Sequence, residues 1–104
     1  MTEKRAFERF IIKLPVTISA GGRTLEGTSV RLSRKGLFVR TQQSFAEGVP
    51  VEIVLTLTNN VSCKLKGVVK YARNIDLVKR QNGMGIEFVE KNETYEKFMF
   101  EVES

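Results

Sequence analysis

Apolar and polar residues alternate along most of the chain, which is the period-2 pattern of half-buried β-strands. The first such segment places Ile12, Leu14, Val16 and Ile18 on one face and the intervening residues on the other. Comparable segments follow at residues 23–32, 37–40, 51–58, 61–71 and 84–88. Six short strands in succession predict a mainly β fold, and a six-stranded antiparallel barrel accounts for them.

Residues that favour turns separate these segments. Gly21-Gly22 joins the first two strands. Asn59-Asn60 predicts a hairpin turn, because asparagine tolerates positive φ. Residues 41–50 and the polar stretch 73–82 are expected to be loops.

Two residues inside the predicted strands restrict how those strands can pair. Pro15 cannot donate a ladder hydrogen bond, so its strand is expected at a sheet edge or without a neighbour on that N–H side. Gly67 predicts a bulge or a sharp bend, of the kind that closes a small barrel.

The C-terminal residues change to a helical period. Asn92 is a good N-cap for a helix that begins just after it. An apolar stripe then falls at i, i+3, i+4 and i+7, formed by Tyr95, Phe98, Met99 and Val102. We therefore expect one amphipathic helix at residues 92–103, packed over the barrel.

The N-terminal residues 1–9 are polar, charged and aperiodic, so a flexible arm is expected ahead of a barrel at residues 10–90. The length of 104 residues suits one hydrophobic core, and a single domain is expected over residues 1–104.

Composition narrows the chemistry. Seventeen basic and twelve acidic residues give a net charge of +5, which favours an anionic partner such as a nucleotide, a nucleic acid or an acidic protein surface. The chain has no histidine, the commonest general base and metal ligand, so neither an enzyme nor a metal site nor a cofactor is expected.

Cysteine content and hydropathy indicate the cellular compartment in which the protein is expected. The single cysteine, Cys63, lies in an alternating run and is expected to be a buried small hydrophobe. One cysteine fits a reducing compartment, and no stretch approaches the roughly 18 apolar residues of a membrane span. We therefore expect a cytoplasmic protein with no membrane insertion.

Two short clusters carry the candidate chemistry. Arg5 and Arg9 are four residues apart in the arm, and Ser33-Arg34-Lys35-Gly36 forms a basic turn after the second strand. Guanidinium groups present a fixed fork of donors that suits phosphate and guanine. Beside the N–H groups of a turn, they predict an anion or nucleotide clamp. The alternative is an ordinary solvated tail beside a plain turn, in which the serine caps an N–H and the glycine supplies positive φ.

The same alternation predicts how the strand before this turn is oriented. Arg31 and Ser33 are expected on the outer face, with Val30 and Leu32 towards the core. The remaining basic side chains are expected to be solvated charges that make no specific contact, namely Arg34, Lys35, Lys64, Lys66, Lys70, Arg73, Lys79 and Arg80.

An RxxxR pair ahead of the first strand, followed by an SxxG turn after the second, resembles the PilZ domain, a family of bacterial receptors for cyclic di-GMP. The resemblance extends to Gly67-Val68-Val69, to the segment Gly83–Phe88 and to the terminal helix. It implies a barrel that binds this dinucleotide and signals to a protein effector.

The resemblance also implies roles for individual residues. Arg5 and Arg9 match the two arginines that wrap around the ligand, and Lys4 stands where the family often has another basic residue. Ser33 matches the motif serine, and Gly36 matches the glycine that lets the backbone turn closely under the ligand.

Arg31 departs from the family pattern, which usually has Asp or Asn at this position. A carboxylate or amide could accept hydrogen bonds from guanine N1–H and N2–H₂, whereas arginine has no acceptor. Arg31 is therefore interpreted in three ways: it donates to guanine O6 and N7, it grips a phosphate, or it marks a receptor that has lost its ligand.

Three functional hypotheses follow. The first is a non-catalytic cyclic di-GMP receptor whose arm orders over the ligand and presents a new surface to a partner protein. The second is a degenerate module of the same fold that binds protein and no nucleotide, with Leu37 and Phe38 as an exposed contact patch. The third, ranked last, is a nucleic-acid-binding barrel, which lacks tryptophan and any evident run of exposed aromatic residues for base stacking.

Overall fold

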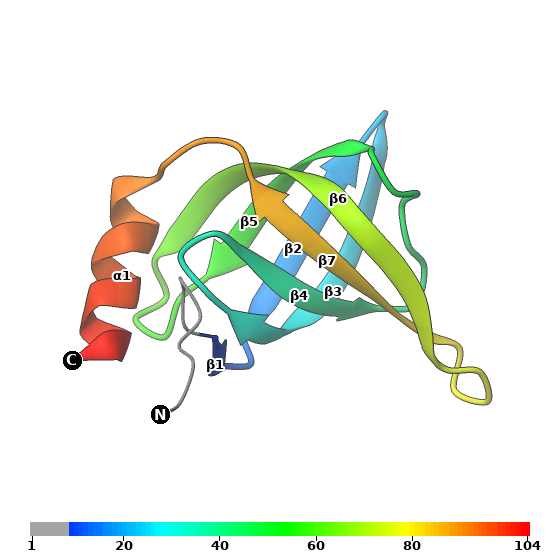
Figure 1. The fold of residues 1–104 in the computed structure, drawn as a ribbon, viewed down its shortest axis with the longest axis horizontal. Coiled ribbons are helices and arrows are strands. Elements are labelled where there is room, and N and C mark those ends of the chain that lie inside the picture. The colour runs from blue at the N-terminus through cyan, green and yellow to red at the C-terminus, as the bar shows by residue number, and fades with distance from the viewer. Residues whose placement is uncertain (1–8) are drawn as a thin grey trace, which may run out of the picture.

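A computed structural model describes residues 9–104 of the chain (Figure 1). In chain order, the described elements are β1 (Phe10–Ile11), β2 (Pro15–Ala20), β3 (Arg23–Leu32), β4 (Gly36–Thr41), β5 (Pro50–Thr56), β6 (Ser62–Asp76), β7 (Gln81–Phe88) and α1 (Glu93–Glu103). Across this part of the chain, no helix combines the length and apolar character needed to cross a lipid bilayer.

Six of the strands close into a barrel. Going round it, β2 pairs with β3, β3 with β4, β4 with β7, β7 with β6, β6 with β5, and β5 with β2 again. Every one of these pairings is antiparallel. The short β1 adds to β3 outside this ring, with Phe10 opposite Leu32. The predicted six-stranded antiparallel barrel is confirmed.

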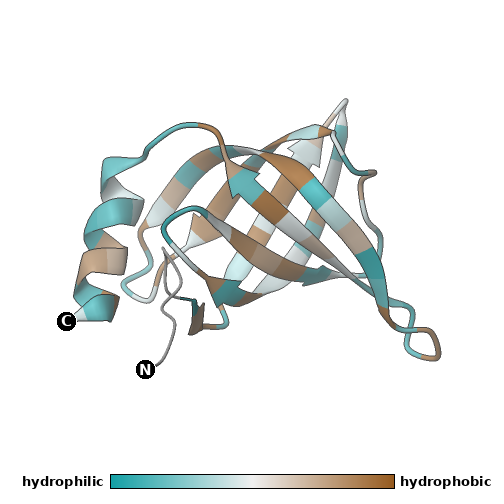
Figure 2. Ribbon diagram, viewed as in Figure 1, coloured by the Kyte–Doolittle hydropathy of each residue, from teal (hydrophilic) through white to brown (hydrophobic). Residues whose placement is uncertain are grey.

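The barrel interior is the hydrophobic core, and the apolar residues of the alternating sequence pattern are the ones that point into it. Apolar and polar positions alternate along the strands (Figure 2). Ile18, Ile53 and Leu55 are almost completely buried, while the residues next to each of them along β2 and β5 are exposed or half-exposed. Cys63 is buried in the same core, as predicted.

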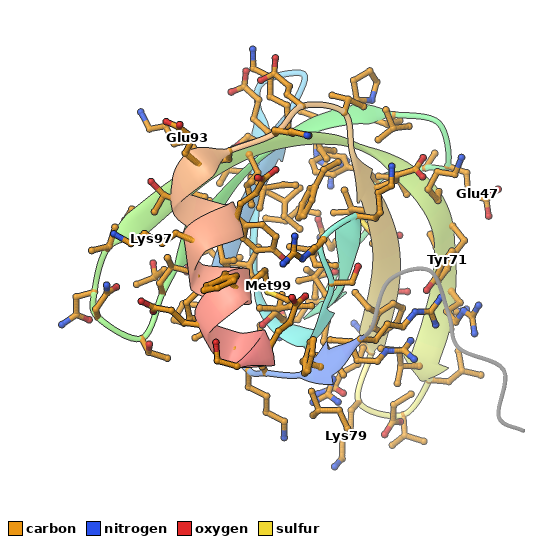
Figure 3. All side chains as sticks on the ribbon, turned by 60° about the vertical axis from the view of Figure 1, so that its left-hand side comes forward. Glu47, Tyr71, Lys79, Glu93, Lys97 and Met99 are labelled. Carbon is orange, nitrogen blue, oxygen red and sulfur yellow. The ribbon has the colours of Figure 1, made fainter. Side chains whose placement is uncertain are left out.

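Helix α1 covers one end of the barrel (Figures 1 and 3). Asn92 caps it, because its side-chain oxygen accepts a hydrogen bond from the Tyr95 backbone N–H at 2.9 Å. Tyr95 and Met99 are buried against the core, and the Tyr95 ring meets the Phe88 ring edge-on. The predicted N-cap is confirmed, and so is the apolar stripe at Tyr95, Phe98 and Met99, whereas Val102 is only half-buried.

The expected loop at residues 73–82 is wrong. β6 continues to Asp76 and β7 begins at Gln81, so only a four-residue turn separates them. The two strands extend past the barrel as a two-stranded hairpin (Figure 1). Most of its residues are exposed or half-exposed, so no alternation marks it in the sequence.

The structure shows how Gly67 and Pro15, the two residues expected to restrict strand pairing, fit into their strands. Gly67 shows no register shift; the shifts in β6 fall between Val69 and Tyr71 and between Asn74 and Asp76. Glycine is needed at 67 because a Cβ there would lie 2.7 Å from the Glu87 carbonyl oxygen. β2 is not an edge strand, but Pro15 precedes its ladder with β5, which satisfies the second of the two expectations for that residue.

Candidate functional site

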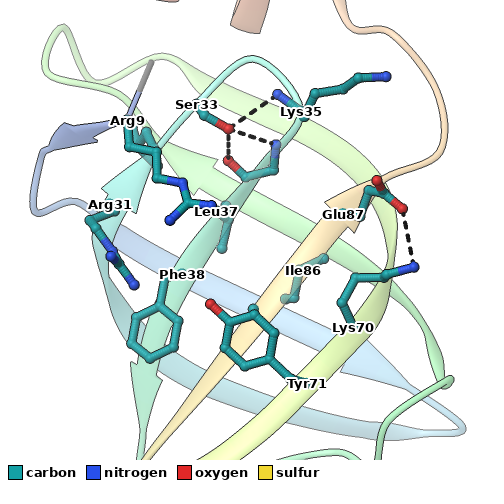
Figure 4. Close-up of a pocket in the computed structure, with 13 residues that line it drawn as sticks. Arg9, Arg31, Ser33, Lys35, Leu37, Phe38, Lys70, Tyr71, Ile86 and Glu87 are labelled. Atoms are coloured by element: carbon teal, nitrogen blue, oxygen red, sulfur yellow. Dashed lines mark hydrogen bonds and ion pairs between the residues drawn. The ribbon is translucent and has the colours of Figure 1, made fainter. Parts of the chain in front are cut away.

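A shallow depression lies on the barrel wall beside the turn that joins β3 to β4 (Figure 4). Its volume is about 170 Å³, and its mouth is open to solvent. The residues that line it are Arg9, Arg31, Leu32, Ser33, Lys35, Gly36, Leu37, Phe38, Lys70, Tyr71, Gly85, Ile86 and Glu87. Four predicted site residues, Arg9, Arg31, Ser33 and Gly36, are therefore brought together here.

The β3–β4 turn is held by the Ser33 hydroxyl. The oxygen accepts from the Lys35 and Gly36 N–H groups, each at 3.2 Å, and the hydroxyl donates to the Gly36 carbonyl at 3.3 Å. A serine hydroxyl has one donor and two acceptor positions, and all of them are used within the turn. Ser33 therefore shapes the turn in the manner that the plain-turn interpretation predicts.

Gly36 is required for a reason that the sequence pattern does not predict. Its φ is not among the positive values in the described chain, so the expectation that it supplies positive φ is wrong. β7 approaches so closely that a Cβ on Gly36 would lie 2.1 Å from the Ile86 carbonyl oxygen. The glycine lets β4 begin directly against β7.

The same turn is tied to the C-terminal helix. The Tyr95 hydroxyl donates to the Ser33 carbonyl at 2.6 Å. Burial raises the pKa of Tyr95 well above its usual value, so the hydroxyl stays protonated and able to donate. The Ser33 carbonyl thus has a buried partner that comes from the opposite end of the chain.

Arg34 adds a second link between the turn and α1. Its guanidinium holds the Glu103 carboxylate through two hydrogen bonds of 2.7 and 2.9 Å. The hydrogen bond from Arg34 lowers the pKa of Glu103. The expectation that Arg34 is a solvated charge without a specific contact is wrong, because the last turn of α1 lies beside the β3–β4 turn and brings Glu103 within reach of Arg34.

Arg31 faces outwards because of a bulge in β3. The register with β4 shifts between Ser29 and Arg31, and Ser29 is buried, with its hydroxyl donating to the Ile12 carbonyl at 2.6 Å. After the shift, Leu32 enters the core and Arg31 lines the pocket, as predicted. Val30 lies within the bulge and is only half-buried, so its predicted place in the core is not reached.

Two aromatic rings form a floor that the sequence motifs do not predict. The Phe38 and Tyr71 rings are stacked, with centroids 5.9 Å apart and planes 27° from parallel. They meet across β7 over Gly85, where a Cβ would lie 2.3 Å from the Tyr71 ring. Gly83 and Gly85, two apart in one strand, were the available signal, because such a pair leaves one face of the strand bare for neighbouring side chains.

Arginine side chains lie on both flanks of this pair of rings. The Arg31 guanidinium carbon is 5.2 Å from the Phe38 ring centroid, and that of Arg73 is 4.7 Å from the Tyr71 ring centroid. Leu37, the neighbour of Phe38, is buried in the core instead. The predicted exposed patch of Leu37 and Phe38 is therefore wrong for Leu37.

Arg9 enters the pocket from the chain before β1. It is exposed and lies on the same side of the pocket as Arg31 (Figure 4). No ion pair joins it to a carboxylate within residues 9–104. Arg5 and Lys4, the other predicted ligand contacts, lie outside the described residues.

Comparison with known proteins agrees with this architecture. No curated protein matches the sequence. Among solved structures, the Bacillus subtilis inhibitor of motility (MotI/DgrA) matches with a TM-score of 0.72 and 21% identity, over 86% of this chain and 44% of that one. This chain therefore spans less than half of that structure, and the likeness is one of fold. The family model of the PilZ domain matches residues 3–101, so the chain belongs to the PilZ domain family.

Proposed function

We propose that the chain is a non-catalytic receptor for cyclic di-GMP. The observation that carries this proposal is that Arg9, Arg31 and the Ser33–Gly36 turn, which are separate in the sequence, line one open depression. Membership of the PilZ family supports the same ligand. The name of the similar Bacillus subtilis structure, an inhibitor of motility, supports a regulatory role.

The chemistry of the pocket suits a doubly negative guanine dinucleotide. Arg9 and Arg31 supply guanidinium groups for phosphate or for the guanine acceptors O6 and N7. The stacked Phe38 and Tyr71 rings offer an apolar floor against which a base can lie. In the proposal, Arg5 and Lys4 also contact the ligand. Arg5 is the first arginine of the RxxxR motif that Arg9 completes, and Lys4 directly precedes it in the sequence.

Signalling requires a partner, and we propose a protein effector that reads the surface formed when the ligand joins the N-terminal residues to the barrel. No catalytic step is proposed. The chain has no histidine, and the pocket has no nucleophile paired with a base among its described residues.

Isothermal titration calorimetry with cyclic di-GMP tests this proposal. Wild type is expected to bind in the micromolar range or tighter. Arg9→Ala removes charge-assisted hydrogen bonds of about 1.5–3 kcal/mol each, so the affinity should fall by roughly 10- to 100-fold. Lys79→Ala removes the same charge at the tip of the β6–β7 hairpin and should bind like wild type. Equal affinities for Arg9→Ala and wild type would contradict the clamp.

The degenerate protein-binding module is the second candidate, and Arg31 favours it. This side chain provides no hydrogen-bond acceptor for guanine, and its guanidinium already lies over the Phe38 ring. Absence of binding heat at millimolar cyclic di-GMP would support this candidate over the receptor.

A further inference from the structure

Four cationic side chains and one carboxylate line the pocket, and the cations are not confined to one side of it. Arg9 and Arg31 lie on one side, and Glu87 lies opposite them beside Lys70 (Figure 4). Glu87 is the one carboxylate among the pocket residues that the structure describes. Its presence needs a reason, because a carboxylate repels the phosphates of an anionic ligand unless it meets hydrogen-bond donors.

Guanine supplies such donors. Its N1–H and N2–H₂ lie side by side on one edge, and a carboxylate can accept from both with its two oxygens. The adenine ring carries an acceptor, N1, at the corresponding place, which a carboxylate would repel. A carboxylate in this pocket therefore separates guanine from adenine.

Other acceptors in the pocket are less suited to this task. Arg31 has none. The Ser33 hydroxyl is fully used within its own turn. The Tyr71 hydroxyl oxygen is a neutral acceptor, so its hydrogen bonds to the guanine edge would lack the charge assistance that a carboxylate gives.

The fold fixes the place of Glu87. On β7 it pairs with Gly36 of β4, and the next residue, Phe88, donates its backbone N–H to the Lys35 carbonyl at 2.8 Å, so the Glu87 backbone lies directly beside the β3–β4 turn. The register shift between Val69 and Tyr71 falls at Lys70, whose Nζ lies 3.5 Å from the Glu87 carboxylate. Both side chains are more than half exposed, and such a pair stabilises little, so a ligand can replace Lys70 at low cost.

We propose that Glu87 is the residue that reads the guanine edge of the ligand, and that it takes over the acceptor role for which the family uses Asp or Asn at the position of Arg31. In this arrangement Arg9 and Arg31 hold phosphate, and Glu87 selects the base. The inference rests on the proposed function.

Calorimetric titrations with cyclic di-GMP and cyclic di-AMP, on wild type and Glu87→Gln, test this assignment. Glu87 is half exposed, so the variant should fold normally. Wild type should prefer cyclic di-GMP. Glu87→Gln should bind cyclic di-GMP about 10-fold or more weakly, since it loses charge-assisted bonds, and should bind cyclic di-AMP as well as wild type or better. Glu90→Gln, a matched substitution outside the pocket, should change neither affinity.

Two results would overturn the assignment while leaving the receptor proposal intact. One is unchanged selectivity of Glu87→Gln between the two dinucleotides. The other is equal tightening of both, which would mean that Glu87 only repels phosphate. If wild type binds neither dinucleotide, the receptor proposal and the assignment of Glu87 fail together.

Discussion

Two connections between strands of this barrel are built in opposite ways. The β3–β4 turn is closed by Ser33 and tied to helix α1 through Tyr95 and Arg34. The tip of the β6–β7 hairpin stands away from the barrel, and its Leu77 and Val78 side chains are 77% and 92% exposed. One connection is held by the core and the helix, and the other is held by its own ladder.

This difference indicates which connection is suited to bind a ligand. A site whose groups are held in place before binding loses less conformational entropy when the ligand arrives. The β3–β4 turn meets this condition, because a buried tyrosine and an ion pair fix it from behind while its outer side lines the pocket. The hairpin tip has no comparable support, so changes there should affect neither folding nor the pocket.

The largest effect is expected from Gly36→Ala. The new Cβ would lie 2.1 Å from the Ile86 carbonyl oxygen, so the backbone of β4 or β7 must shift. The free energy of unfolding, measured by urea denaturation, should fall by about 3 kcal/mol or more. Val78→Ala, the control at the hairpin tip, should change it by no more than about 0.5 kcal/mol. Similar losses for the two variants would remove the contrast between the connections.

A smaller effect is expected from Tyr95→Phe. This variant leaves the part-buried Ser33 carbonyl without its 2.6 Å hydrogen bond, which should lower the free energy of unfolding by about 1–3 kcal/mol. Tyr71→Phe is the matched control, since the structure gives the Tyr71 hydroxyl no hydrogen-bond partner within residues 9–104. A Tyr95→Phe variant as stable as wild type would show that the helix does not hold the turn.

The smallest effect is expected from Arg34→Ala, and it should depend on pH. Arg34 lowers the pKa of Glu103 in the folded protein, so the stabilisation is present above the ordinary pKa of a glutamate and disappears as the pH falls through the folded value. The Tm of Arg34→Ala should therefore lie slightly below that of wild type at pH 7 and equal it at pH 2.5. A Tm difference that persists at low pH would mean that Arg34 acts through packing and not through Glu103.

The sequence predicted those parts of the fold in which periodicity reports burial. The six barrel strands, the Asn92 cap and the stripe with Tyr95 and Met99 all follow from alternation or helical spacing. The extension of β6 to Asp76 does not, because a hairpin exposed on both faces leaves no apolar period. Alternation of apolar and polar residues predicts a strand only where one face of that strand is buried against the rest of the protein.

The pocket was predicted in part for a similar reason. Arg9, Arg31 and Ser33 were found from motifs and strand alternation. The Phe38–Tyr71 floor depends on which strands are neighbours, since β7 lies between the two residues and supplies only Gly85. The link from Arg34 to Glu103 likewise joins residues 69 positions apart, which no local pattern reveals.

The most direct test of the central claim is an NMR titration of the labelled protein with cyclic di-GMP. Saturable shifts are predicted for the backbone amides of Lys35, Gly36 and Glu87, which border the pocket, while those of Leu77 and Val78 stay unchanged. No saturable shifts at all, or shifts confined to the hairpin tip, would contradict the account.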